Sequence, residues 1–152
     1  MTRATRLTET ELRAWQAFLH AHHEVVEALD RELRQEHGVT LSEYDVLLRL
    51  ARAPERALRM GDLAARVLLS PSGITRLVER LEARGLLYRS ADPVDGRVAL
   101  ATLTGRGLRL IRVAARTHVG GIREHFSGRL RGPELRAVAS ALERIAGPHE
   151  PH

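Results

Sequence analysis

The 152-residue sequence contains no cysteine and no lysine, and aromatic residues make up only 3% of it. Without a thiol, the chain has no disulfide framework, thiolate zinc site, cysteine nucleophile or thiol-based redox sensor. Long apolar runs are also missing. The longest stretch without Asp, Glu or Arg is 14–23, whereas a membrane-spanning helix needs roughly 18 apolar residues. Charged residues precede any apolar stretch, so we expect no signal peptide and a soluble, cytoplasmic protein without a membrane partner.

The charge that is present is mostly positive. All 24 Lys+Arg positions are arginine, against 19 Asp and Glu, which leaves a formal net charge of +5. A positive excess points to an anionic partner such as nucleic acid. Hydrophobic residues make up 43% of the chain, which is typical of a folded domain, and the length fits one domain, 1–152.

Two capping boxes predict the first two helices. In each, a threonine is followed three residues later by a glutamate: Thr8 with Glu11, and Thr40 with Glu43. Apolar residues at steps of three and four extend the first helix to His37-Gly38. The second runs from residue 41 until Pro54 ends it.

The pattern between residues 59 and 85 predicts two short helices joined by a turn. The first includes 63–67, and Ser70-Pro71 has the N-cap serine and first-turn proline that begin the second. Arg84-Gly85 ends that helix. Apolar residues form its buried stripe: Ile74, Leu77, Val78 and Leu81. Together these features indicate a helix-turn-helix.

A β-hairpin is predicted directly after it. The segments 86–90 and 98–103 favour strands, and Pro93 and Asp95-Gly96 favour the turn between them. Thr104 begins another helix, which the interior Gly120-Gly121 pair should weaken or bend. A last helix follows from residue 133 to 147.

The runs 68–86, 92–97 and 103–107 resemble the recognition helix, the wing and the start of the next helix in MarR-family regulators. This resemblance implies a mainly α fold with a winged helix-turn-helix. It implies a DNA-binding lobe over 41–103 and dimerisation helices over 8–37 and 104–147. The homodimer would use apolar residues of the first and last helices: Leu12, Leu135, Val138, Leu142 and Ile145.

A helix that enters the major groove needs small or hydroxyl side chains and a guanidinium at its start. The candidate DNA-binding residues are Ser70, Pro71, Ser72, Gly73, Thr75, Arg76 and Arg80 in the second helix and Arg89, Asp95 and Arg97 in the hairpin. The family resemblance implies that Arg97 enters the minor groove and that Asp95 orients it. A narrow minor groove favours a planar cation. Arg89 is expected to contact phosphate.

The resemblance also implies that small aromatic anions bind between the first helices and the DNA-binding lobe. The candidate effector pocket comprises Trp15, Phe18, His22, Tyr44 and Arg112. Arg112 would pair with a carboxylate or phenolate of the effector. Trp15 and Tyr44 are also explained by core or interface packing.

Of the eight histidines, His20 and His23 are three residues apart on the first helix while His22 points elsewhere, and His118 has no paired ligand on its helix. A structural or solvent-facing role is favoured over zinc binding, so we expect no metal site. No catalytic constellation or phosphate loop is visible, and we expect no enzymatic activity and no cofactor. The sequence therefore predicts a ligand-responsive repressor that binds a pseudopalindromic operator on double-stranded DNA as a homodimer. Two alternatives stay open: a metal-responsive regulator of the same fold, and an interaction module that does not bind DNA.

Overall fold

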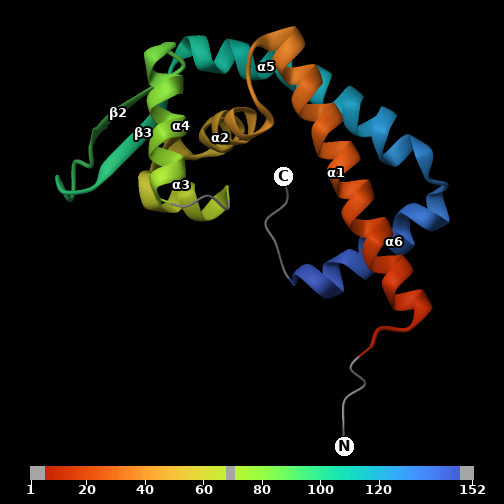
Figure 1. Ribbon diagram of the computed structural model, residues 1–152. Helices are drawn as coiled ribbons and strands as arrows, with labels where there is room; N and C mark the ends of the chain where they lie inside the picture. Colours follow the sequence, from red (N-terminus) through yellow and green to blue (C-terminus); the bar gives the residue numbers. More distant parts are fainter. Residues whose placement is uncertain (1–5, 68–70, 148–152) are drawn as a thin grey trace, which may run out of the picture. The chain divides into compact units, whose positions relative to one another are not determined.

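The computed structural model describes residues 6–67 and 71–147 (Figure 1). The chain folds into two compact units. The central unit is Leu29–His118, and the terminal unit combines Met1–Ala28 with Val119–His152. The described helices are α1 (Glu9–His37), α2 (Leu41–Arg52), α3 (Met60–Arg66), α4 (Pro71–Ala83), α5 (Gly105–His125) and α6 (Gly132–Ala146). The strands are β1 (Ala57–Arg59), β2 (Leu87–Ala91) and β3 (Ala99–Leu103), and short 3-10 turns span Pro54–Arg56 and Ser127–Arg129. The predicted mainly α, winged helix-turn-helix fold is confirmed.

Both predicted capping boxes are present. The Thr8 amide donates to Glu11 Oε2 at 2.7 Å, and the Glu11 amide donates to Thr8 Oγ1 at 3.2 Å. At α2 the corresponding distances between Thr40 and Glu43 are 2.9 Å and 3.0 Å. Gly38 ends α1 with a φ of +67°, the left-handed conformation that glycine adopts without strain.

Helix α4 buries the predicted apolar stripe. Ile74, Leu77, Val78 and Leu81 are all at most 3% exposed. The Leu86 amide donates to the Leu81 carbonyl at 3.0 Å and closes the end of the helix. Ser70, the predicted cap of α4, lies outside the described residues. Helix α3 begins at Met60, three residues earlier than the predicted segment 63–67.

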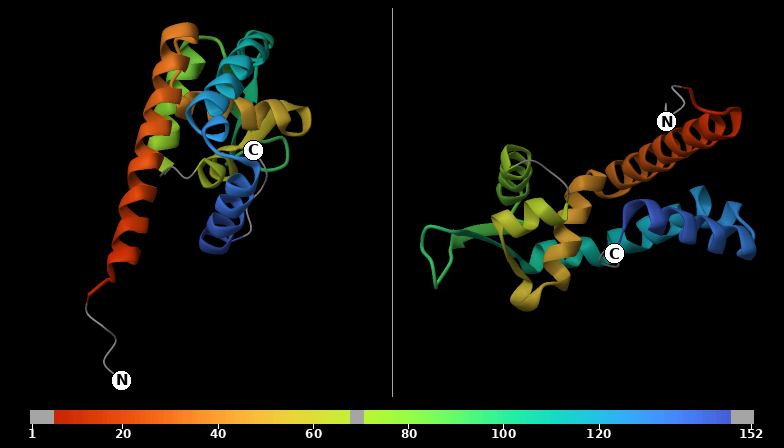
Figure 2. Two further views of the ribbon diagram at one scale, coloured as in Figure 1. Left: turned by 90° about the vertical axis from the view of Figure 1, so that its right-hand side faces the viewer. Right: turned by 90° about the horizontal axis from the view of Figure 1, so that it is seen from below.

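The predicted hairpin is confirmed, with each strand beginning one residue later than expected. Strands β2 and β3 pair antiparallel, from Leu87 opposite Leu103 to Ala91 opposite Ala99. The hairpin projects from the helices of the central unit in Figure 1 and in the right-hand view of Figure 2. Strand β1, which the sequence pattern did not predict, pairs with the other edge of β3 and makes a three-stranded sheet in the order β1-β3-β2.

One apolar core fixes the position of α4 in the central unit. Its largest side chains are fully buried and come from the end of α1, from α2, α3 and α4, and from β2: Leu33, Leu47, Leu50, Leu63, Leu81 and Leu87. Ile111 and Ala114 add the apolar face of α5. The helix-turn-helix and the sheet therefore share a single core, which stabilises them as one body.

The terminal unit presents an apolar surface instead. Leu12, Trp15 and Leu19 follow one another at helical steps of three and four on α1, and each is between 44% and 53% exposed. Ile145 on α6 is 80% exposed, and α6 has no buried residue. Such a face is typical of a protein-protein interface. In the described part of the chain, no helix has the length and apolar character needed to cross a membrane.

Helix α5 continues through Gly120-Gly121 without interruption, and its glycines allow a matched test. A Cβ at Gly107 would collide with the carbonyl oxygen of Leu86 and lie 2.6 Å from Leu103 Cδ1. Gly107→Ala is therefore expected to destabilise the fold by about 1–3 kcal/mol. A Cβ at Gly120 meets nothing within 4 Å, so Gly120→Ala should stabilise it by up to about 1 kcal/mol. Urea unfolding of both variants checks the two signs, and equal effects would contradict the packing described.

Candidate nucleic-acid interface

The N-terminal half of α4 presents small and polar groups away from the core. Ser72 and Arg76 are exposed, and Gly73 and Thr75 are partly exposed. The first turn of α4 contains no acidic residue. Pro71 is the first residue of α4. Ser72, Thr75 and Arg76 can approach an anion or a base edge while the opposite face of α4 stays in the core.

The tip of the hairpin is built around Asp92, a residue that the sequence reasoning had not selected. Asp92 is only 6% exposed, and its Oδ1 accepts the backbone amides of Val94 at 2.7 Å and Asp95 at 3.3 Å. Its Oδ2 accepts from Nε of Arg59, in β1, at 2.8 Å. Strand β1 and two amides of the tip thus converge on one carboxylate, which fixes the tip relative to the sheet.

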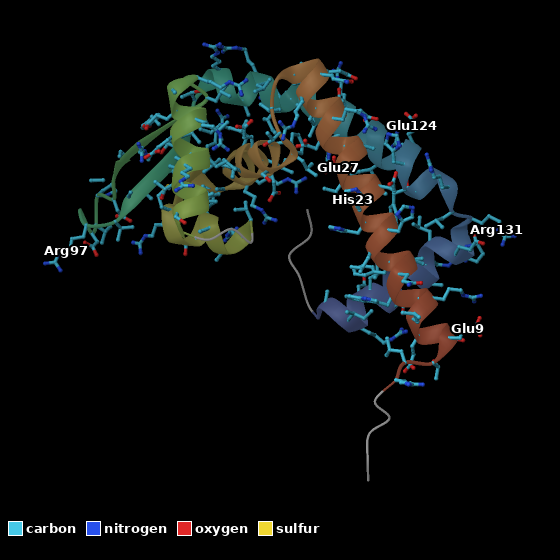
Figure 3. The ribbon with its side chains drawn as sticks, in the orientation of Figure 1. Glu9, His23, Glu27, Arg97, Glu124 and Arg131 are labelled. Carbon is cyan, nitrogen blue, oxygen red and sulfur yellow. The ribbon has the colours of Figure 1, made fainter. Side chains whose placement is uncertain are left out.

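Arg97 lies exposed at the end of this hairpin (Figure 3). Its backbone amide donates to Asp95 Oδ1 at 3.1 Å, and the Val98 amide donates to the Asp95 carbonyl at 2.9 Å. Asp95 therefore holds the backbone of Arg97 and not its guanidinium. This contact fixes the backbone of the turn that carries Arg97.

Arg89 connects the hairpin to α4. Its amide donates to Glu82 Oε1 at 2.7 Å, and its Nε donates to Glu82 Oε2 at 2.9 Å. A weaker pair joins Arg89 Nη1 to Glu79 at 3.7 Å. The Arg89 amide, followed by its side chain, lowers the pKa of Glu82. In this structure Arg89 is thus engaged by α4, a role that the sequence reasoning had not anticipated.

A shallow hollow of about 500 Å³ lies beside this connection. Its lining comes from the end of α4, both strands of the hairpin and the loop between them: Glu82, Arg89, Ser90, Ala91, Gly96, Arg97, Val98 and Ala99. The hollow gives the hairpin a concave side that includes Arg97.

The candidate effector residues divide between the two units. In the terminal unit, Phe18 lies between Trp15 and His22 on α1, with ring centroids 6.2 Å and 6.3 Å apart. In the central unit, Tyr44 is buried and its ring lies 4.5 Å from that of His118. Burial raises the pKa of Tyr44. Arg112 is exposed on α5.

Asp92→Asn tests the construction of the hairpin tip through its pH dependence. The Val94 amide is the largest of the causes that lower the pKa of Asp92 below its ordinary 3.8. The ionised Asp92 carboxylate therefore stabilises the fold fully at pH values above 3.8. This stabilisation is lost as the pH falls through the lower pKa that Asp92 has in the folded state. We expect the variant to have a lower melting temperature than the wild type near neutral pH, and this difference to narrow as the pH falls below 3.8. Thermal melts across this range check it, and a gap that stays constant would contradict it.

Comparison with known proteins gives consistent results over most of the chain. A family model described as "MarR family" matches residues 37–98. The Bacillus subtilis protein "Uncharacterized HTH-type transcriptional regulator YkoM" is 30% identical over 145 residues, 95% of this chain and 90% of that protein. AbsC, a MarR family transcriptional regulator from Streptomyces coelicolor, is 32% identical with a TM-score of 0.88, covering 94% of this chain and 96% of that one. Sco3205 from the same organism, solved in complex with DNA, is 29% identical with a TM-score of 0.91. The match covers 99% of this chain and 94% of Sco3205.

Two further similar proteins have more specific descriptions. The "HTH-type transcriptional repressor Rv2887" of Mycobacterium tuberculosis is 31% identical over 108 residues, 71% of this chain and 76% of that protein. CouR from Rhodococcus jostii RHA1, solved bound to p-coumaroyl-CoA, is 28% identical with a TM-score of 0.72. The match covers 88% of this chain and 91% of CouR.

Proposed function

Because this chain belongs to the MarR family of DNA-binding transcriptional regulators, which are not enzymes, we propose that it is a ligand-responsive repressor. In this proposal it binds a pseudopalindromic operator as a homodimer and releases it when a small molecule binds. The observation that carries the proposal is the pairing, in one central unit, of the polar start of α4 with the exposed Arg97 at the hairpin tip.

These two features suit the two grooves of one duplex. In the proposal, Ser72, Thr75 and Arg76 approach base edges and phosphates in the major groove, because small and hydroxyl side chains let a helix come close. Gly73 belongs to the same candidate surface. Ser70 and Pro71 stay candidates from the sequence alone. Arg97 approaches the adjacent minor groove, where a narrow groove concentrates negative potential.

Dimerisation is supported by the uncovered apolar surface of the terminal unit. A second copy would bury Leu12, Trp15 and Leu19 of α1 together with Ile145 of α6, all of which are exposed in the single chain. A two-fold axis would then present two α4 helices to successive major grooves about 10 base pairs apart. The operator would accordingly be an inverted repeat.

Repression and ligand response are supported by the similar proteins. One of them is described as a repressor, and another is solved with p-coumaroyl-CoA, an aromatic acyl thioester. We propose an aromatic or phenolic anion as the effector of this chain. Trp15, Phe18 and His22 offer exposed aromatic and imidazole surface in the terminal unit, and Arg112 offers an exposed cation in the central unit. Tyr44 is only 3% exposed and packs against His118. An effector that binds only the conformation with low DNA affinity would shift the protein towards it.

Titration against DNA tests the proposal. The probe is the duplex that the wild-type protein enriches most from a random-sequence library, here called the selected duplex, and the control is its scrambled sequence. We expect tighter binding to the selected duplex than to the scrambled one. A plot of log affinity against log salt concentration should fall with a slope of about 0.9 for each phosphate that the protein neutralises. Aromatic acids that raise the melting temperature should weaken this binding. Equal affinities for the two duplexes, or binding unaffected by salt, would overturn the proposal.

A further inference from the structure

Glu43 of α2 joins two arginines from the C-terminal end of the α4 segment, and we propose that it positions α4 for DNA reading. In this proposal, Arg80 holds α4 through its contact with Glu43 and does not contact DNA. The contacts of Glu43 with Arg80 and Arg84 are called the tether below. The inference rests on the proposed role of α4 as the DNA-reading helix. It changes the interpretation of Arg80, which the sequence pattern places among the DNA-binding candidates.

Glu43 is a buried charge with three polar partners. The residue is only 5% exposed. Its Oε1 lies 3.4 Å from Nε of Arg80, and its Oε2 lies 3.7 Å from Nη1 of Arg84. Oε2 also accepts the backbone amide of Thr40 at 2.9 Å. The carboxylate therefore connects the start of α2 with the last turn of α4 and the residue that follows it.

Each arginine makes a second contact, Arg84 to the chain between α1 and α2 and Arg80 within α4 itself. Arg84 Nη1 donates to the carbonyl of Gly38, between α1 and α2, at 2.9 Å. Arg80 Nη1 donates to the carbonyl of Arg76 at 3.4 Å, one turn earlier in α4. Because Arg80 and Arg84 are four residues apart, they extend from the same side of the helical segment towards Glu43. One side of α4 is thus tethered by charge, in addition to the apolar stripe that enters the core.

The capping box alone does not account for a charge at this position. Glutamine serves as well as glutamate at the third helical position of a capping box. A buried carboxylate is costly unless cations and hydrogen-bond donors compensate it. Arg80 and Arg84 supply that compensation, and they come from the segment whose placement matters for DNA binding.

The functional consequence is orientation. The apolar stripe holds α4 against the core, and the tether limits rotation of α4 about its axis. Arg76 lies one turn before Arg80, so a small rotation would move its guanidinium away from the bases. Recognition geometry tolerates errors of only about 0.5 Å and 10–20°. The tether therefore affects the discrimination between DNA sequences more than the overall electrostatic affinity for DNA.

Glu43→Gln separates these roles, because glutamine keeps the capping box and loses the charge. Glu11→Gln is the matched control, since Glu11 forms the other capping box, with Thr8, in the terminal unit. Both variants raise the net charge by one, which by attraction alone would strengthen DNA binding. We expect Glu43→Gln to bind the selected duplex about tenfold more weakly, and the scrambled duplex no more weakly than the wild type does. Glu11→Gln should bind both duplexes as the wild type does.

Arg80→Gln provides the second arm and does not depend on the folding of the Glu43 variant, because the Arg80 side chain is 58% exposed. A tether predicts weaker binding to the selected duplex with an unchanged salt slope. If Arg80 instead contacts a phosphate, the slope of log affinity against log salt should be smaller by about 0.9 in Arg80→Gln. The double variant Glu43→Gln with Arg80→Gln should bind the selected duplex with the same affinity as whichever single variant binds it more weakly. Both changes break the same contact between Glu43 and Arg80, so their effects should not add.

Three results would overturn the proposal. They are unchanged discrimination between the duplexes in Glu43→Gln, a reduced salt slope in Arg80→Gln, and additive losses in the double variant. Failure of the proposed function would look different, because the wild type itself would then not discriminate between the selected and scrambled duplexes.

Discussion

Arg97→Ala is expected to lower the affinity for the selected duplex by about tenfold to a hundredfold, the range for one arginine that reads a groove. Arg97 lies exposed at the hairpin tip, and the turn that carries it is closed by Asp95. The variant keeps the backbone amide that Asp95 accepts, so the turn is retained. Thermal melting should therefore be unchanged, and fluorescence anisotropy titration measures the loss of affinity.

Arg106→Ala is the matched control for the Arg97 variant. Arg106 is also exposed, but it lies on α5, and its replacement removes the same amount of charge. If net charge alone governs binding, the two variants should lose affinity equally. A specific role for the hairpin tip predicts a much smaller loss for Arg106→Ala. Unchanged affinity in Arg97→Ala would contradict the assignment of the hairpin as a DNA-binding wing.

Disrupting the apolar surface of α1 should have the largest effect on DNA binding. The double variant Trp15→Asp with Leu19→Asp places two charges where a second copy would otherwise pack. Both side chains are about half exposed in the single chain, so the fold of each chain should remain. We expect a monomer, and an affinity for the selected duplex lower by about a hundredfold or more, because linked half-sites gain that much from avidity.

The control for this variant is Ala17→Asp. Ala17 is exposed on α1 and lies on the side of the helix away from Leu12, Trp15 and Leu19. It tests the cost of a new aspartate in this helix without altering the apolar surface. Sedimentation velocity should show a dimer for the wild type and for Ala17→Asp. A monomeric wild type, or a double variant that remains dimeric, would contradict the proposed dimer surface.

Much of the local structure could be predicted because its causes are local. The Thr8 and Thr40 capping boxes set the helix starts, and Gly38 and Gly85 adopt the positive φ that ends a helix or turns the chain after it. The hairpin followed from strand-favouring residues on either side of the turn formers Pro93 and Asp95-Gly96. These signals involve neighbours within a few residues, so periodicity and capping rules detect them.

Strand β1 was missed for a physical reason. It contains only three residues, too few to show a strand pattern, and it depends on pairing with β3. The chain reaches it through Glu55 and Arg56, which adopt φ values of +52° and +58°. Neither residue type favours that conformation, so tertiary context decides it.

The site was predictable in its residue types and less so in its connections. The sequence placed Arg76 and Arg97 at exposed positions, and the structure agrees. Arg80 and Arg89 also looked like exposed cations, but Glu43 and Glu82 engage them. Glu43 and Arg80 are 37 residues apart, and sequence spacing carries no information about such a pair. Asp92 was equally hidden, because its role depends on Arg59 in the strand that was missed.

The symmetry of the selected duplex tests the central claim most directly. Sequencing the pool that the wild-type protein enriches from random duplexes reads out the arrangement of its two reading helices. The account predicts an inverted repeat whose half-site centres are about 10 base pairs apart. Enrichment of a single, asymmetric site, or no enrichment at all, would contradict a dimer that reads two half-sites through α4 and the wing.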